Sequence, residues 1–291
     1  MRSLHETHAG RGLPLKSTSL TTLPSFLKRR LQSIGAIRLR TETTASVQLT
    51  ACAKVVSEFF ADVFSQLDHW QSRVQSVDGR LHGAELDDAV AAFAIPALER
   101  PDSALIGAGF IGDARDNSGR RLHFAWWIGP IDANPLLAET TKSTRLDITE
   151  RRYADYVSDF SALEWYRMPQ AIRQTHVTGP YVDYLCTCDY ILTITAPVFV
   201  DADMAGVDEM FGVVGADVFV RSFERAVMPS LLAIPADAAV LNESGRVVVS
   251  TDPSLPVGSV LSEITKEFEW NTVACAEGPF SVAMRKKDTP R

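Results

Sequence analysis

The sequence of 291 residues is short of cysteine and has no long apolar run. Its four cysteines, Cys52, Cys186, Cys188 and Cys275, are too few and too scattered for the disulfide framework of a small secreted domain. No stretch reaches the roughly 18 uninterrupted apolar residues of a membrane-spanning helix, and the N-terminal residues lack the apolar core of a secretory signal. We therefore expect a soluble cytoplasmic protein with reduced thiols and no membrane contact.

Positive charge is also in short supply. The chain has 29 lysines and arginines against 36 aspartates and glutamates, which gives a formal net charge of −7 at pH 7. A surface of this sign repels nucleic acids and anionic membranes, so we expect neither as a partner. With 46% hydrophobic and 22% charged residues, the composition is otherwise that of a globular protein with one large or two small domains.

The motifs of common enzyme and cofactor sites are missing. The sequence contains no G-x-S-x-G nucleophile elbow, no phosphate-binding loop and no H-E-x-x-H zinc motif. Gly107, Gly109 and Gly112 match the dinucleotide pattern G-x-G-x-x-G, but a polar turn and a second strand follow where that pattern needs a helix. The Cys186-x-Cys188 pair offers only two thiols, and a metal site needs three or four convergent ligands. We expect no enzyme, no cofactor and no metal site.

Helical periodicity dominates the first third of the chain. Residues 1–22 are polar and aperiodic, and we expect a disordered tail. A helical region is predicted over 23–100, made of a short helix at 24–34, a long helix at 45–77 and a third helix at 86–98. Apolar residues recur along the long helix at steps of three and four: Cys52, Val56, Phe59, Val63, Leu67, Trp70, Val74 and Val77. Because Val55, Phe60 and Phe64 widen this stripe, we expect part of it to pack against a second copy in a homodimer.

Strand patterns dominate the rest of the chain. A larger α+β module is predicted over 101–222, beginning with two strands joined by a turn at Asn117–Gly119. Its central run, 160–220, holds the aromatic pair Trp165-Tyr166, a predicted turn at Gly179–Tyr181 and two β-rich stretches. A connecting helix and a smaller module with two further hairpins are predicted over 223–291.

Asp217 is the best candidate for a functional residue that the pattern alone offers. It lies near the end of an otherwise apolar strand, where a carboxylate is costly to bury unless something polar or cationic meets it. Aromatic faces together with a carboxylate form a receptor for a small cation. The alternative is that Asp217 pairs with Arg221 or Arg225 or caps a nearby loop.

Several short motifs occur in an order that resembles the double Cache family of sensor domains. They are Trp165-Tyr166, Pro180-Tyr181-Val182-Asp183, Thr195-Ala196-Pro197-Val198 and Gly212-Val213-Val214-Gly215-Ala216-Asp217, followed by a hairpin at Ala239–Ser250. The resemblance covers about Ala45 to Arg285. It implies an α+β fold with a long N-terminal helix and two PAS-like modules built on antiparallel sheets.

The resemblance also implies a ligand pocket in the larger module. It carries five residues over as pocket residues, to which we add Trp127 and Tyr156: Trp165, Tyr166, Tyr181, Asp183, Asp217, Trp127 and Tyr156. Because Trp126 and Trp127 alternate along a strand, at most one of them reaches a pocket on a given face. The family's amino-acid binders hold the ligand carboxylate with an Arg two residues before the Trp-Tyr pair, and this position is Leu163 here. A related amine-binding branch does without that Arg.

These observations predict a soluble Cache-type sensor that binds a small cationic, amine-like metabolite without a free carboxylate and relays its presence to a regulatory protein partner. An amino-acid or purine sensor is the alternative within the family, with Arg167 or Arg173 as the carboxylate clamp. A small-molecule enzyme is the alternative of a different class.

Overall fold

The computed structural model describes residues 25–76, 83–116, 119–131, 141–146, 160–184, 187–200, 209–265 and 268–286. The chain divides into two compact units, Met1–Thr44 and Ala45–Arg291. The second unit is an α+β fold with two antiparallel sheets. None of the helices in the described part of the chain combines the length and the apolar character that a membrane crossing needs.

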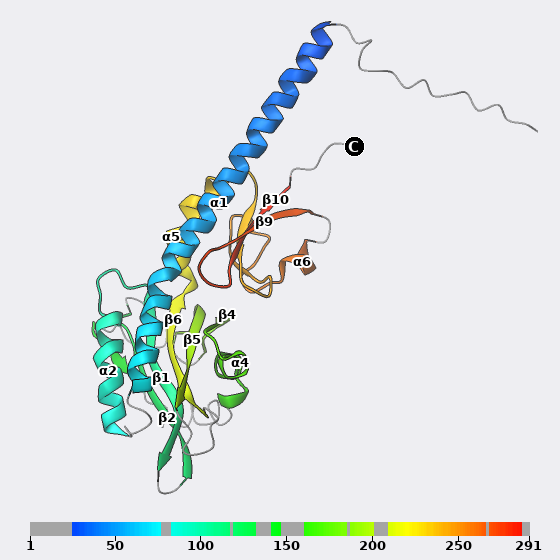
Figure 1. Cartoon of the computed structure of the whole chain (residues 1–291). Coiled ribbons are helices and arrows are strands. Elements are labelled where there is room, and N and C mark those ends of the chain that lie inside the picture. Colours follow the sequence, from blue (N-terminus) through cyan, green and yellow to red (C-terminus); the bar gives the residue numbers. More distant parts are fainter. Residues whose placement is uncertain are drawn as a thin grey trace, which may run out of the picture. The chain divides into compact units, whose positions relative to one another are not determined.

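Helix α1 is a single helix that spans Ser25–Ser76, so the prediction of separate helices at 24–34 and 45–77 is wrong (Figure 1). The intervening residues include Gly35 but no proline, and a lone glycine weakens a helix without ending it. The predicted apolar stripe is buried from Cys52 to Val74 except at Phe59, which is partly buried.

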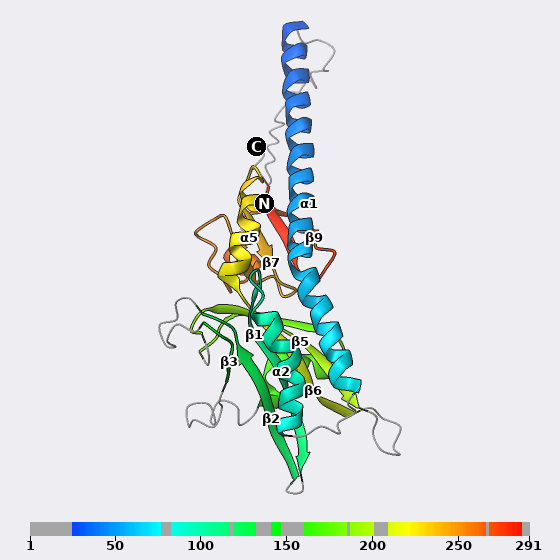
Figure 2. The ribbon, with the colours of Figure 1, turned by 90° about the vertical axis from the view of Figure 1, so that its left-hand side faces the viewer.

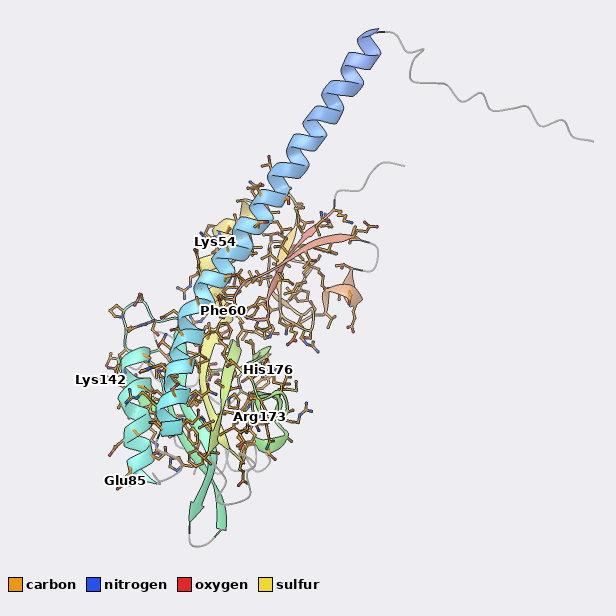
Figure 3. The ribbon with its side chains drawn as sticks, in the orientation of Figure 1. Lys54, Phe60, Glu85, Lys142, Arg173 and His176 are labelled. Atoms are coloured by element: carbon orange, nitrogen blue, oxygen red, sulfur yellow. The ribbon has the colours of Figure 1, made fainter. Side chains whose placement is uncertain are left out.

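Phe60 of α1 shows what the apolar stripe packs against. It is fully buried, and its ring stacks on Phe280 at a centroid distance of 4.3 Å and lies 5.0 Å from Phe223 (Figure 3). Val55, Phe59 and Phe64 pack against the same core. The additional apolar residues of the stripe therefore pack within the same chain. The homodimer inferred from them stays a prediction.

The larger sheet has the strand order β3-β2-β1-β6-β5-β4, and all its neighbouring strands are antiparallel. Its strands are β1 Leu105–Asp116, β2 Gly119–Ile128, β3 Thr144–Arg145, β4 His176–Val182, β5 Tyr190–Val200 and β6 Glu209–Phe219. The predicted turn at Gly179–Tyr181 is wrong, because these residues belong to β4 and the register against β5 shifts there between Thr178 and Tyr181. A bulge in an edge strand explains why a Gly-Pro pair reads as a turn in the sequence.

Helices cover both faces of this sheet (Figures 1 and 2). Helix α2, Ala84–Leu98, packs against β1 and β2, and its Phe93 stacks on Trp70 of α1 at 5.1 Å. Helix α4, Glu164–Ile172, packs against β4, β5 and β6, and the 3₁₀ turn η2, Phe160–Ala162, packs against α4. Because successive side chains of a strand alternate between faces, the sheet presents one face to α1 and α2, here called the helix face, and the other to α4, here called the pocket face.

The smaller sheet has the strand order β8-β7-β10-β9. Helix α5, Val220–Leu232, leads into β7 Ala238–Leu241 and β8 Val247–Ser250, and the short helix α6, Leu261–Ile264, precedes β9 Trp270–Ala274 and β10 Ser281–Arg285. Ser57 of α1 binds this module through its hydroxyl, which accepts the backbone N–H of Ala276 at 2.9 Å. The two modules thus share α1 as a packing partner.

Candidate ligand site

Asp217 lies near the end of β6, an interior strand of the larger sheet, on the pocket face. Its cross-strand neighbours are Gly107 of β1 and Thr193 of β5, and the Thr193 hydroxyl donates to Asp217 Oδ1 at 2.6 Å. A Cβ atom at Gly107 would lie 2.7 Å from Asp217 Oδ2 and 2.8 Å from Trp126 Nε1. Gly107 therefore makes room for a carboxylate and an indole ring, which explains one glycine of the G-x-G-x-x-G pattern without a nucleotide.

The buried position of Asp217 changes its acidity. The side chain is 9% exposed, and burial raises the pKa of Asp217 to about 7, with a further contribution from the negative charge of Asp183. The hydrogen bond from Thr193 opposes this increase but does not cancel it. A carboxyl group in this state ionises readily when a cation arrives, because the cation offsets both causes of the raised pKa.

Asp183 supplies the second carboxylate of the site. It is 7% exposed and directly follows β4, and its Oδ2 accepts hydrogen bonds from the backbone N–H of Thr187 at 3.0 Å and from the Thr187 hydroxyl at 3.1 Å. These bonds close the turn between β4 and β5. The Tyr181 hydroxyl bonds the Thr193 hydroxyl at 2.7 Å, which connects β4 to the Asp217 carboxylate through Thr193.

These residues surround a small cavity, here called the inner chamber, with a volume of about 70 Å³. Its polar wall is formed by Asp183, Asp217, Thr193 and Thr195, and its aromatic wall by Trp126, Trp165 and Tyr181. A Cβ atom at Gly215 would lie 3.1 Å from the Trp126 ring, so this glycine, like Gly107, lets the indole lie flat on the sheet. The Thr195 hydroxyl donates to the carbonyl oxygen of Trp165 at 2.7 Å and fixes the start of α4 over β5.

A larger cavity of about 510 Å³, here called the outer cavity, lies against the inner chamber. The two cavities share four wall residues, Leu163, Trp165, Tyr181 and Asp183. The outer cavity is further lined by Glu164 and Thr178 of the larger module and by residues of the turn between β7 and β8 in the smaller module: Asn242, Ser244 and Arg246. It therefore lies between the two modules.

The structure brings four of the seven predicted site residues to these cavities: Trp165, Tyr181, Asp183 and Asp217. Tyr166 is buried beside them in the core beneath α4, with its ring edge-to-face on Phe160 at 4.7 Å. Trp127 lies on the helix face, and its neighbour Trp126 lines the inner chamber instead. Tyr156 lies outside the described residues.

The arginines weighed in the sequence lie elsewhere. Arg221 pairs with Asp189 at 2.9 Å, and Arg225 donates to the Arg221 carbonyl oxygen, so neither is the partner of Asp217. Arg173 lies over the Phe199 ring at 3.8 Å, close to His176 on the α4–β4 side of the sheet (Figure 3). Neither Arg167 nor Arg173 lines the inner chamber or the outer cavity.

Sequence reasoning missed Trp126, Thr193 and the three residues from the smaller module. Strand alternation predicts that only one of Trp126 and Trp127 faces the pocket. Which of the two does so is decided by the register of β2 on β1. Within the described part of the chain, no group of three or more His, Cys, Asp or Glu side chains is placed to hold a metal ion.

No protein-family model matches the sequence, and no curated protein sequence matches it. Solved structures do match the fold. The ligand-binding domain of the Pseudomonas aeruginosa PAO1 chemoreceptor PctC, in complex with GABA, is 18% identical with a TM-score of 0.53, over 85% of this chain and 100% of that one. The corresponding domain of the Pseudomonas fluorescens chemoreceptor CtaA, in complex with L-valine, is 16% identical with a TM-score of 0.52, over 87% and 100%. The extracellular domain of the putative histidine kinase soHK1S-Z6 is 10% identical with a TM-score of 0.52, over 86% and 96%.

Proposed function

The chain has the fold of the double Cache sensor domains, and from this premise we propose that it is a ligand-binding sensor module whose ligand is a small amine. In this proposal the larger module, 101–222, binds the ligand and the smaller module, 223–291, takes part in relaying its presence to a regulatory partner. The observation that carries the proposal is the pair of buried carboxylates, Asp183 and Asp217, that line one aromatic-walled chamber.

Charge is the first reason for an amine. The inner chamber has two carboxylates on its wall and no lysine or arginine among its described wall residues. A ligand ammonium group brings a positive charge to this wall and donates hydrogen bonds to carboxylate oxygens. The indole rings of Trp126 and Trp165 add faces that attract a cation.

The position of Leu163 is the second reason. Leu163 lines both cavities, and an alkyl side chain there offers no charge to a carboxylate attached next to the ligand nitrogen. A carboxylate buried without a cation carries a large desolvation cost. The proposal is therefore an amine without a carboxylate on the adjacent carbon. GABA and L-valine, found in the PctC and CtaA complexes, both carry an ammonium group, which supports an amine as the ligand of this chain. The position of a carboxylate in the ligand is inferred from this chain's own residues.

A thermal-shift screen of amines, amino acids and purines tests this function. A ligand present at about one hundred times its dissociation constant adds roughly 2.7 kcal/mol to the unfolding free energy, which raises the melting temperature visibly. Asp217→Asn removes the charge and keeps the shape, so it should lower the affinity for the best amine by at least about tenfold. The exposed Asp68→Asn on α1 is the control and should change nothing.

Two outcomes would count against the proposal. Binding of the best amine that is insensitive to Asp217→Asn would place the ligand elsewhere. Mass spectrometry of the ligand after incubation with the protein tests for turnover. Chemical conversion of the ligand would identify an enzyme rather than a sensor.

A further inference from the structure

The inner chamber is too small for a whole ligand. Its volume of about 70 Å³ is far below that of a usual ligand site, so it accommodates an end group of a ligand rather than the whole molecule. Sites for small molecules usually measure about 300–1,000 Å³, a range that includes the outer cavity of 510 Å³. Because the two cavities share Trp165, Tyr181 and Asp183, a ligand with its ammonium at Asp217 extends its other atoms into the outer cavity.

The far wall of the outer cavity belongs to the smaller module and is held in place by hydrogen bonds. Asn242 Nδ2 donates to the carbonyl oxygen of Gly179 on β4 at 2.6 Å. Asn242 Oδ1 accepts the backbone N–H of Arg246 at 2.8 Å and the Ser244 hydroxyl at 3.0 Å. The β7–β8 turn is therefore preorganised against the β4 edge before any ligand arrives.

Arg246 gives this wall a positive charge. Of the described residues that line either cavity, it is the one lysine or arginine. Its Nη1 donates to the Gly258 carbonyl oxygen at 2.8 Å, which fixes one edge of the guanidinium group. A guanidinium group has five N–H donors, so the rest of the fork is available to an acceptor in the cavity. Glu164, a carboxylate on the same cavity, is engaged by His176 Nε2 at 3.0 Å.

We propose that the outer cavity is a second subsite, which binds an anionic far end of the ligand through Arg246. This inference rests on the proposed amine site and names the ligand class more closely: an unbranched chain with an ammonium group at one end and a carboxylate at the other. The carboxylate that Leu163 cannot bind next to the nitrogen is bound at a distance, by a residue of the other module. Such a ligand touches β6 of the larger module and the β7–β8 turn of the smaller one, and it ties the two together.

Three amines of equal length test the subsite: pentan-1-amine, pentane-1,5-diamine and 5-aminopentanoate. Their affinities are measured by isothermal titration calorimetry at pH 8, where Asp217 is ionised. We expect 5-aminopentanoate to bind about tenfold more tightly than pentan-1-amine, because a charge-assisted hydrogen bond is worth on the order of one decade in affinity. The diamine should bind more weakly than 5-aminopentanoate, because its second ammonium group meets Arg246.

Arg246→Gln should remove the preference for 5-aminopentanoate and leave the affinity for pentan-1-amine within about twofold, whereas Arg246→Lys should keep part of the preference. The matched control is Arg225→Gln on α5, which lines neither cavity and should change no affinity. Melting temperatures of the variants show whether the β7–β8 turn remains folded.

The outcomes separate the two proposals. If Asp217→Asn lowers the affinity for all three amines but Arg246→Gln leaves the order of their affinities unchanged, the second subsite is refuted and the amine site is supported. If wild-type protein binds pentan-1-amine and 5-aminopentanoate equally, the second subsite is likewise refuted. If no amine depends on Asp217, both proposals fall together.

Discussion

The two faces of the larger sheet are built from the same strands and have opposite characters. On the helix face, residues such as Ala108, Leu192 and Ala216 are fully buried against α1 and α2. On the pocket face, one residue further along the strands, Thr193 and Asp217 carry hydroxyl and carboxylate groups. The difference shows that period-two alternation lets one strand contribute to a dry core and to a polar chamber at once.

The comparison also separates stability from binding. The helix face joins the sheet to α1 and so supports the fold of both modules. The pocket face keeps a buried carboxylate with a raised pKa, which no folding requirement explains. Groups that are unfavourable for folding gather where a ligand binds, so substitutions on the two faces should have different effects.

Trp126 and Trp127 allow the sharpest test, since they are adjacent and both buried. Trp127→Ala should lower the unfolding free energy by about 3–5 kcal/mol, because it leaves a large cavity in the helix-face core. The amine affinity of the protein that remains folded should stay within about twofold. Trp126→Ala should lower the amine affinity by about tenfold, because a cation loses an indole face. Urea denaturation and calorimetry measure the two quantities. An equal loss of amine affinity in both variants would contradict the assignment of stability to the helix face and binding to the pocket face.

The pH dependence of stability should also distinguish the faces. The pKa of Asp217 rises on folding from 3.8 to about 7, so between these values the folded state binds more protons than the unfolded state. As far as this group is concerned, stability is greatest below about pH 4 and falls by on the order of 4 kcal/mol between about pH 4 and pH 7. Amine affinity should change in the opposite direction and increase up to pH 8, because the ammonium binds the ionised carboxylate.

Asp217→Asn should flatten both profiles, in denaturant titrations and in calorimetry at matched pH values. It removes the titrating group while Thr193 can still donate a hydrogen bond to the amide oxygen. An unchanged slope of stability against pH in this variant would mean that a group other than Asp217 causes it.

Much of the fold could be predicted from local pattern. The apolar stripe of α1, the strand pair around Asn117–Gly119 and the two antiparallel modules all follow from periodicity and motif order, and the structure confirms them as an α+β fold. Helix α4 was not predicted, because its nine residues include Pro169 and a mixture of polar and aromatic side chains. Such a short segment takes its helical form from packing against β4 and β5 rather than from its own propensity.

The site was predictable only in part, for a related reason. Asp217 and Trp165 stand out in the sequence by type and by motif. Arg246 does not, because its place on the same cavity as Trp165 depends on how the β7–β8 turn packs against β4, as the Asn242–Gly179 hydrogen bond shows. Contacts between residues more than sixty positions apart are set by tertiary structure, and no local pattern records them.

The smallest expected effect concerns two threonines that lie opposite each other on the pocket face. Thr178 of β4 pairs in register with Thr193 of β5. The Thr178 hydroxyl is buried and has no hydrogen-bond partner in the described part of the chain, whereas the Thr193 hydroxyl bonds both Asp217 and Tyr181. Thr178→Val replaces an unpaired hydroxyl with a methyl group of the same shape, so it should raise the unfolding free energy by about 1 kcal/mol.

Thr193→Val is the matched control, because it makes the same chemical change one strand away. It removes the donor to the Asp217 carboxylate and the partner of the Tyr181 hydroxyl, so it should lower the unfolding free energy by about 1–2 kcal/mol at pH 8. The two variants are therefore expected to move the urea midpoint in opposite directions at constant slope. If both lower it, the Thr178 hydroxyl has a partner in solution, and the pocket face is more fully satisfied without a ligand than the comparison of the two faces implies.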